Sequence, residues 1–315
     1  MALLHAFKGV PSTFGDLADQ LLRLVVARLS AASRVDVVFD CYNDMSIKSF
    51  ERNKRAGTES LLVAIAGSTT KCPKKWSKAL HVSANKAAIV SFLVEEWQKV
   101  KYAPLIAQRS LFVTSGEQCW LFRTEASDGT VTVQRFAVPE LECSHEEADT
   151  RMLLHAQHAA NTGQASVIIR SPDTDVAVIA CSLASQIQAR LIFQTGTAQR
   201  MRYLDLTAIA ASFGQGVATS LIGMHSMTGC DTTSAFSGRG KKAAFALMKT
   251  PRFRRAMGAL GMLFEVSEQV LADAEAFLCT LYGKPNFNDI NELRYHLSCT
   301  RPGNTSHGPG THCHP

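Results

Sequence analysis

The stretch VIIRSPDTDVAVIA, residues 167–180, indicates the fold class of this chain most directly. Residues 167–169 are β-branched and typical of a strand buried on both faces, and Pro172 ends that strand because proline cannot donate to a sheet ladder. Asp173 and Asp175 therefore follow the carboxyl end of a strand, the edge at which open α/β sheets bind ligands. Two carboxylates held this close repel each other unless a cation, a proton or a basic side chain lies between them.

A purely structural role for these carboxylates is the alternative. Asp173 would cap a helix that begins near Thr174, and Asp175 would complement the dipole of that helix. The pair alone does not distinguish this role from ligand binding.

Three more acidic sites lie in similar settings. The apolar strand expected at residues 35–39 ends at Asp40, Glu147 and Asp149 lie at the start of an expected helix, and Asp231 follows a Gly-Cys turn. Carboxylate oxygens suit Mg²⁺ or Mn²⁺, whereas zinc would favour Cys and His at ligand spacing. The sequence therefore favours an oxygen-rich metal site.

Glu147 also has a structural alternative. Ser144 and Glu147 have the spacing of a capping box for a helix that runs to about residue 160. That role leaves one carboxylate oxygen of Glu147 for a cation.

The composition is that of an ordinary globular protein. The chain has 315 residues, of which 46% are hydrophobic and 19% charged, which is enough for one large domain or two small ones. Its nine cysteines are scattered singly, so we expect reduced thiols, and no apolar run approaches the roughly 18 residues of a membrane span. We expect an intracellular protein, located in the nucleus, that does not contact membranes. The net charge of +6 permits a polyanionic partner without requiring one.

Two basic segments follow the first acidic site. Lys48, Arg52 and Arg55 lie on one face of an expected helix just after Asp40. This face has two interpretations, a phosphate-binding surface or an ordinary solvent-exposed helix face. Residues 71–78, KCPKKWSK, form a second cluster, which we interpret as a solvated loop rather than a nucleic-acid contact or import signal.

A glycine-rich turn opens a further helix in the segment SGRGKKAAF. Gly238 and Gly240 flank Arg239, and Lys241 and Lys242 follow. Backbone N–H groups at such a helix start favour a phosphate, and the three cations would add charge-assisted contacts.

The remaining periodicity predicts alternating helices and strands. Helices are expected at residues 14–29, 84–100 and 203–213, with two more within 266–298. Strands are expected at 111–113 and 190–194, together with a hairpin whose turn is residues 127–129. Residues 301–315 have no apolar face and are expected to be disordered.

The acidic and basic motifs together resemble a known family. In order, VFD, a basic helix, EEAD, SPDTD and TGCD followed by SGRGKKAAF are similar to the motifs of the PIN-like superfamily, and within it of the flap-endonuclease group. The similarity spans about residues 35–250.

This resemblance implies a fold and an activity. The fold would be a PIN-like α/β/α core with a central, mainly parallel sheet in residues 1–222, then a helix-turn-helix and C-terminal helices in 223–300. The activity would be that of a structure-specific nuclease that hydrolyses phosphodiester bonds with two Mg²⁺ or Mn²⁺ ions. The expected substrate is DNA.

The resemblance also assigns the site residues. The metal ligands would be Asp40, Glu147, Asp149, Asp173, Asp175 and Asp231; Lys48, Arg52 and Arg55 would act on the scissile phosphate; Gly238, Arg239, Gly240, Lys241 and Lys242 would bind the nucleic-acid backbone.

The sequence departs from the family pattern in ways that support an alternative. The family begins with a strand that carries a further ligand Asp, which is not present here, so we expect a fragment. Asp149 replaces a Glu, and Cys41 replaces the Gly after Asp40. The alternative is a catalytically inactive PIN-like module that binds nucleic acid or a protein. A third hypothesis is that residues 171–175 are the acidic motif of a phosphohydrolase or a glycosyltransferase. The phosphohydrolase is disfavoured, because its nucleophilic Asp would directly follow the strand, whereas Ser-Pro lies between them here.

Overall fold

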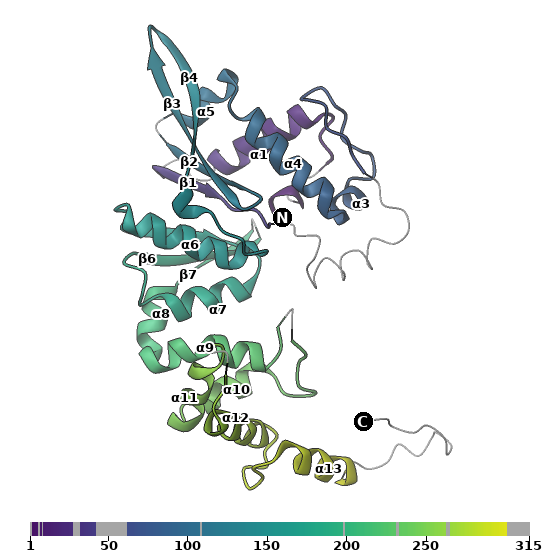
Figure 1. Ribbon diagram of the computed structural model, residues 1–315, viewed down its shortest axis with the longest axis vertical. Helices are drawn as coiled ribbons and strands as arrows, with labels where there is room; N and C mark the ends of the chain where they lie inside the picture. Colours follow the sequence, from purple (N-terminus) through teal and green to yellow (C-terminus); the bar gives the residue numbers. More distant parts are fainter. Residues whose placement is uncertain are drawn as a thin grey trace, which may run out of the picture. The chain divides into compact units, whose positions relative to one another are not determined.

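The computed structural model describes residues 2–5, 7, 9–27, 32–41, 62–107, 109–197, 199–230, 233–262 and 265–300 (Figure 1). The chain forms two compact units, the first being Met1–Val176 with Ile187–Asp205 and the second Ala177–Gln186 with Leu206–Pro315. The division near Asp205 precedes the boundary that the sequence suggested at residue 222. The described residues are mixed α/β, in agreement with the α/β class expected from the sequence. The expected central, mainly parallel sheet is wrong for these residues, because they form two separate sheets in which two strand pairs are parallel and three are antiparallel.

The first unit contains a four-stranded sheet of order β1-β2-β3-β4. Its strands are β1 (Arg34–Val37), β2 (Ser110–Ser115), β3 (Gln118–Ser127) and β4 (Thr130–Ala137). β1 is parallel to β2, and the other pairs are antiparallel. The expected hairpin is confirmed: Asp128 (φ 50°) and Gly129 (φ 75°) adopt the left-handed conformation that a tight β3–β4 turn requires.

Apolar side chains on one face of this sheet pack against two helices, α1 (Phe14–Ala27) and α4 (Ser83–Glu96). Leu17, Leu21 and Leu22 of α1 are fully buried in this core, because their spacing puts them on one helical face. The core also includes Val35, Val37, Leu93, Trp97, Leu111, Val113 and Phe122.

The opposite face of the sheet packs against α6 (Ala148–Asn161). Side chains alternate across a strand, so Phe112 points away from its neighbours Leu111 and Val113. Phe112 clusters with Cys119 and Leu141, and Leu154 of α6 packs against them.

The second sheet of this unit has the order β5-β6-β7. β5 (Ser166–Arg170) is parallel to β6 (Arg190–Thr197), and β6 is antiparallel to β7 (Arg200–Asp205). The helix expected from residue 203 is therefore wrong at its start, since residues 203–205 belong to β7 and α8 (Leu206–Phe213) begins after them.

Short elements complete the first unit: η1 (Ala2–His5), α3 (Trp76–His81), η2 (Val100–Tyr102), α5 (Ala103–Ile106) and η3 (Pro139–Leu141). The loop expected at residues 71–78 thus gives way to a helix at Trp76, with Trp76 and Leu80 facing the core.

Helices form the described part of the second unit. They are residues 177–183 of α7 (Thr174–Leu183), α8, α9 (Gln215–Met227), α10 (Lys241–Leu247), α11 (Pro251–Ala259), α12 (Glu268–Leu281) and α13 (Ile290–Thr300). The last two confirm the pair expected within residues 266–298. Gly223 of α9 lies against Met257 of α11 so closely that an added Cβ would be 2.0 Å from the Met257 carbonyl oxygen.

No single helix of the described residues is long and apolar enough to cross a membrane, although α8 and most of α9, bent by 102° between them, together reach that length and composition.

Candidate functional site

The end of β1 and the beginning of α6 meet through two hydrogen bonds. Asp40 Oδ1 accepts from the Ala148 backbone N–H at 3.1 Å, and the Cys41 N–H donates to the Glu146 carbonyl oxygen at 2.8 Å. Glu147 is the residue before the helix and Asp149 lies in its first turn. Three of the six expected metal ligands, Asp40, Glu147 and Asp149, are thus brought together, and we call them the α6 carboxylates.

The local environment suits negative charge. The N-terminus of a helix carries a partial positive charge from its aligned peptide dipoles, which stabilises nearby carboxylates. All three α6 carboxylates are half-buried, so solvent screens their mutual repulsion less than on an open surface. The site therefore holds more oxygen donors than capping alone needs.

The capping box expected from Ser144 and Glu147 is wrong. The helix begins only at Ala148, and Glu147 makes no side-chain capping bond. Asp40, from a distant part of the chain, already accepts the first free N–H of the helix. In addition, the Cys143 N–H donates to the Glu117 carbonyl oxygen at 2.9 Å, which ties the chain before the helix to the β2–β3 turn.

A buried arginine fixes the other end of this junction. Arg151 of α6 has no exposed surface, and its guanidinium donates to the carbonyl oxygens of Gly116 at 2.7 Å and, more weakly, of Glu117, Gln118 and Phe39 at 3.4–3.5 Å. Arg151 therefore connects α6 both to the β2–β3 turn and to the residue before Asp40.

A second polar network joins β1 to α6 and was not foreseen from the sequence. Asp36 accepts from Arg34 at 2.8 Å and lies 2.7 Å from His155 Nδ1, while Arg34 Nη1 lies 2.9 Å from His158 Nδ1. The Arg34 guanidinium also stacks over the Phe112 ring at 3.9 Å. Alternation in RVDV hinted that Arg34 and Asp36 share a face, but nothing local revealed their partners.

This network changes the acidity of two members. Burial alone would raise the pKa of Asp36, but the hydrogen bonds from Arg34 and His155 outweigh burial and lower it. Burial and the Arg34 charge lower the pKa of His158. The network is therefore an ion pair with a histidine that resists protonation.

Asp173 has the structural role that the sequence left open. Its Oδ1 accepts from the Asp175 backbone N–H at 2.9 Å, which caps α7 (Thr174–Leu183). The Asp173 N–H in turn donates to Ser171 Oγ at 3.0 Å. Asp175 lies in the first turn of α7, and both carboxylates are half-buried.

The structure describes only part of the expected metal site. Asp231 and the three basic residues Lys48, Arg52 and Arg55 lie outside the described residues. Among those it does describe, no group of three or more His, Cys, Asp or Glu side chains is arranged to hold a metal ion. The α6 carboxylates have the donor chemistry of a Mg²⁺ site, but the described residues alone do not complete one.

The glycine-rich turn does open a helix, as expected, with Gly240 directly before α10. Lys241, however, turns back onto α9: its Nζ donates to the His225 and Gly229 carbonyl oxygens, at 3.1 Å for His225. It thus caps the C-terminal end of α9, where free carbonyl groups favour a cation.

The other residues of the turn differ from Lys241. Arg239 stacks over the Tyr282 ring at 5.2 Å and donates to the Tyr282 carbonyl oxygen at 3.3 Å. Gly238 has a positive φ of 68°, and Lys242 is exposed. Lys242 is therefore the cation of this turn that is most available to a phosphate.

Comparison of the chain with protein-family models, with curated protein sequences and with solved structures found no match. The resemblance to the PIN-like superfamily rests on the sequence motifs.

Proposed function

We propose that this chain is a PIN-like, divalent-cation-dependent nuclease that hydrolyses phosphodiester bonds in structured nucleic acid. The proposed substrate is DNA. The observation that carries the proposal is the Asp40–Ala148 hydrogen bond, which brings the α6 carboxylates together at the end of a parallel strand. Acids that are distant in the sequence and gathered at such an edge are what a metal-dependent hydrolase needs.

Each acid has a role in the proposal. Asp40 and Asp173 each present one oxygen to a backbone N–H, which fixes the orientation of the carboxylate. Both are proposed to be cation ligands. Glu147, Asp149 and Asp175 supply further oxygen donors, with Asp231 completing the set. Mg²⁺ or Mn²⁺, when bound, would activate water and neutralise charge on the phosphate.

The basic residues would act on the nucleic acid. Lys48, Arg52 and Arg55 are proposed to stabilise charge on the scissile phosphate. Gly238, Arg239, Gly240 and Lys242 are proposed to contact the backbone without reading sequence. Because Lys241 caps α9, its part in phosphate binding is secondary to its structural role.

A second function is favoured by a specific observation. The described acids do not form a metal-holding group, and Asp173 and Lys241 both serve as caps. These features fit a catalytically inactive module of the same fold that binds nucleic acid or a protein partner.

Asparagine variants separate charge from capping. Asp40→Asn and Asp173→Asn keep an oxygen that can accept the Ala148 or Asp175 N–H, yet remove the negative charge. If the acids are ligands, each variant should retain the unfolding midpoint of the wild type and lose at least about 100-fold of its Mg²⁺-dependent cleavage of a flap or hairpin DNA. Asp128→Asn, in the β3–β4 turn, is the matched control and should cleave normally.

The outcomes discriminate the two functions. Cleavage that persists in EDTA, or that survives both asparagine variants, contradicts the metal-dependent mechanism. Binding of the DNA without cleavage at any Mg²⁺ or Mn²⁺ concentration supports the inactive module instead. In either case Lys242→Ala should lower the slope of log affinity against log salt by about 0.9.

A further inference from the structure

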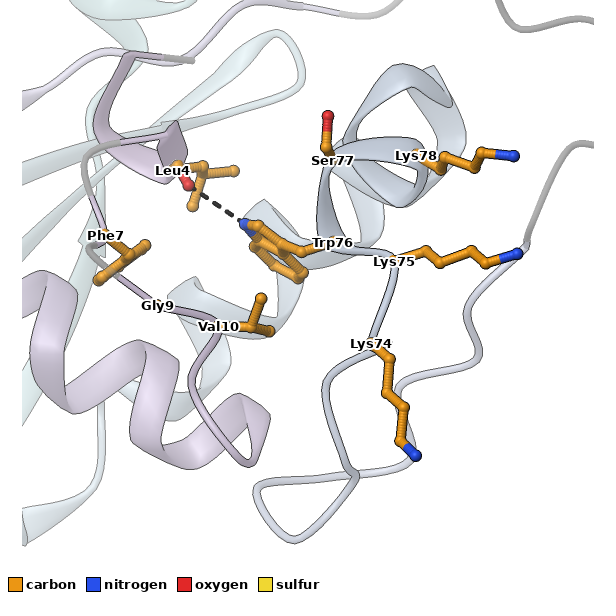
Figure 2. Close-up of a pocket in the computed structure, with 9 residues that line it drawn as sticks. All are labelled: Leu4, Phe7, Gly9, Val10, Lys74, Lys75, Trp76, Ser77 and Lys78. Carbon is orange, nitrogen blue, oxygen red and sulfur yellow. Dashed lines mark hydrogen bonds between the residues drawn. The ribbon is translucent and has the colours of Figure 1, made fainter.

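A pocket with an apolar floor and a cationic rim lies in the first unit, between four residues near the N-terminus and residues 74–78 (Figure 2). Its volume is about 350 Å³, near the lower end of the range of roughly 300–1,000 Å³ for ligand pockets. The residues that line it are Leu4, Phe7, Gly9, Val10, Lys74, Lys75, Trp76, Ser77 and Lys78.

The floor is built to accept an apolar group. Figure 2 shows the side chains of Leu4, Phe7 and Val10 gathered around the Trp76 indole. The indole N–H donates to the Leu4 carbonyl oxygen at 3.3 Å, which holds η1 against the start of α3. Val10 remains 44% exposed, so apolar surface is open to a partner.

The rim carries positive charge that nothing in the described chain neutralises. Lys74, Lys75 and Lys78 are exposed, and within the described part of the chain they form no ion pair. Their ammonium groups point away from the apolar floor in Figure 2. The residues that line the pocket include no Asp or Glu. The carboxylate of Asp16 lies on the side of Cys72, where burial and, to a smaller extent, the Asp16 charge raise the pKa of that thiol.

The geometry disfavours a nucleic-acid base as the occupant. Base stacking needs an open aromatic face, but Trp76 is only 8% exposed and its N–H is already used. The accessible apolar surface of the floor belongs to Val10 and to the half-buried Phe7, which can contact an aliphatic or aromatic side chain without a stacking geometry.

We propose that this pocket binds an acidic peptide segment of a partner protein, with one or two apolar residues inserted into the floor and flanking carboxylates paired with the three lysines. An apolar anchor in a small pocket, surrounded by charges that steer and orient the partner, is a recurrent arrangement at protein interfaces. This interaction surface is independent of the proposed nuclease activity.

Fluorescence polarisation of a fluorescein-labelled peptide, Glu-Asp-Phe-Leu-Asp-Glu, with the full chain tests the proposal. A peptide with Ser-Ser in place of Phe-Leu should bind at least about 10-fold more weakly, because it lacks the anchor. Val10→Asp should weaken binding of the first peptide by a similar factor of about 10 or more, since it places a carboxylate at the exposed edge of the floor.

A matched pair of lysine variants separates the rim from general charge. Lys75→Ala/Lys78→Ala should weaken the Phe-Leu peptide by about 5-fold or more and reduce the salt dependence of binding. Lys249→Ala/Arg255→Ala removes the same charge from exposed positions of the second unit and should leave the affinity unchanged.

Three results would overturn the proposal. One is equal binding of the Phe-Leu and Ser-Ser peptides, which would indicate only general attraction of acids to lysines. Another is binding of an oligothymidylate, and not the peptide, that is lost in Lys75→Ala/Lys78→Ala, which would assign the rim to nucleic acid. The last is binding of dodecanoate in place of the peptide, which would make the pocket a site for small amphipathic anions.

Discussion

Replacing Arg151 by Met tests how α6 is held against the sheet that positions its carboxylates. The side chain is fully buried, and Met fills much of the same volume without donating hydrogen bonds. Only the bond to the Gly116 carbonyl oxygen, at 2.7 Å, has strong geometry, because the other three are 3.4–3.5 Å long.

The expected loss follows from that one strong bond. A hydrogen bond from a charged donor contributes about 1.5–3 kcal/mol, and leaving a buried carbonyl oxygen unsatisfied costs a further ~1 kcal/mol. The Arg151 Nε is buried and makes no hydrogen bond among the described residues. Removing this unsatisfied donor is favourable and offsets part of the lost free energy of unfolding. We therefore expect Arg151→Met to lower the free energy of unfolding by about 2–3 kcal/mol.

Tryptophan fluorescence during urea unfolding is the appropriate assay. All three tryptophans, Trp76, Trp97 and Trp120, lie in the first unit, so their emission reports on the unit that contains Arg151. Arg123→Met is the matched control because Arg123 is exposed and, among the described residues, donates only to Ser110 Oγ. A loss below about 1 kcal/mol in Arg151→Met, no larger than in the control, would refute the reasoning.

Three further predictions concern other parts of the structure. The folded-state pKa of His158 is lowered, so the unfolded chain binds more protons and stability should fall as the pH drops below about 6.5; His158→Gln should flatten the dependence of the urea midpoint on pH in that window, whereas an unchanged slope would contradict it. Gly223→Ala should destabilise α9–α11 packing by about 2 kcal/mol or more, because the new Cβ would clash with the Met257 carbonyl oxygen; thermal unfolding followed by circular dichroism measures this. Gly258→Ala, where the nearest atom is 4.0 Å away, should be neutral or stabilising, and equal effects of the two would disprove the close packing. Lys241→Ala should lower the same thermal midpoint more than Lys242→Ala, because only Lys241 caps α9; equal midpoints would show that the cap is not stabilising.

Local signals in the sequence were sufficient for several elements. The apolar run before Pro172 predicted β5, Asp173 was correctly recognised as a possible cap for α7, and Asp128-Gly129 predicted the β3–β4 turn. In each case the residues that decide the structure are neighbours in the chain. The expected burial of β5 on both faces is wrong, because Ile168 is 48% exposed while Ile169 is buried.

Other features depend on residues far apart in the sequence. The start of α6 was misplaced because its capping acceptor, Asp40, lies 108 positions before Ala148. The Asp36–His155 contact joins residues 119 positions apart, so no short pattern revealed it. The last three residues of β7 were assigned to a helix because exposed residues such as Tyr203, 60% accessible, give the strand no buried alternation.

In the candidate site, too, the residue types could be predicted from the sequence, whereas the long-range contact between them could not. The sequence proposed which acids belong together, and the structure places Asp40, Glu147 and Asp149 at one helix terminus. What the sequence could not supply was the hydrogen bond that gathers them, because it depends on how α6 packs over the end of β1.

Direct binding of Mn²⁺ to the full chain, followed by electron paramagnetic resonance of the free ion, tests the central proposal that the α6 carboxylates contribute to a cation site that Asp231 completes. We predict saturable binding to the wild type that weakens at least about 10-fold, or about 1.4 kcal/mol, in Asp40→Asn and in Asp149→Asn, but not in Asp128→Asn. Absence of saturable Mn²⁺ binding by the wild type, or equal affinity of all four proteins, would contradict the account.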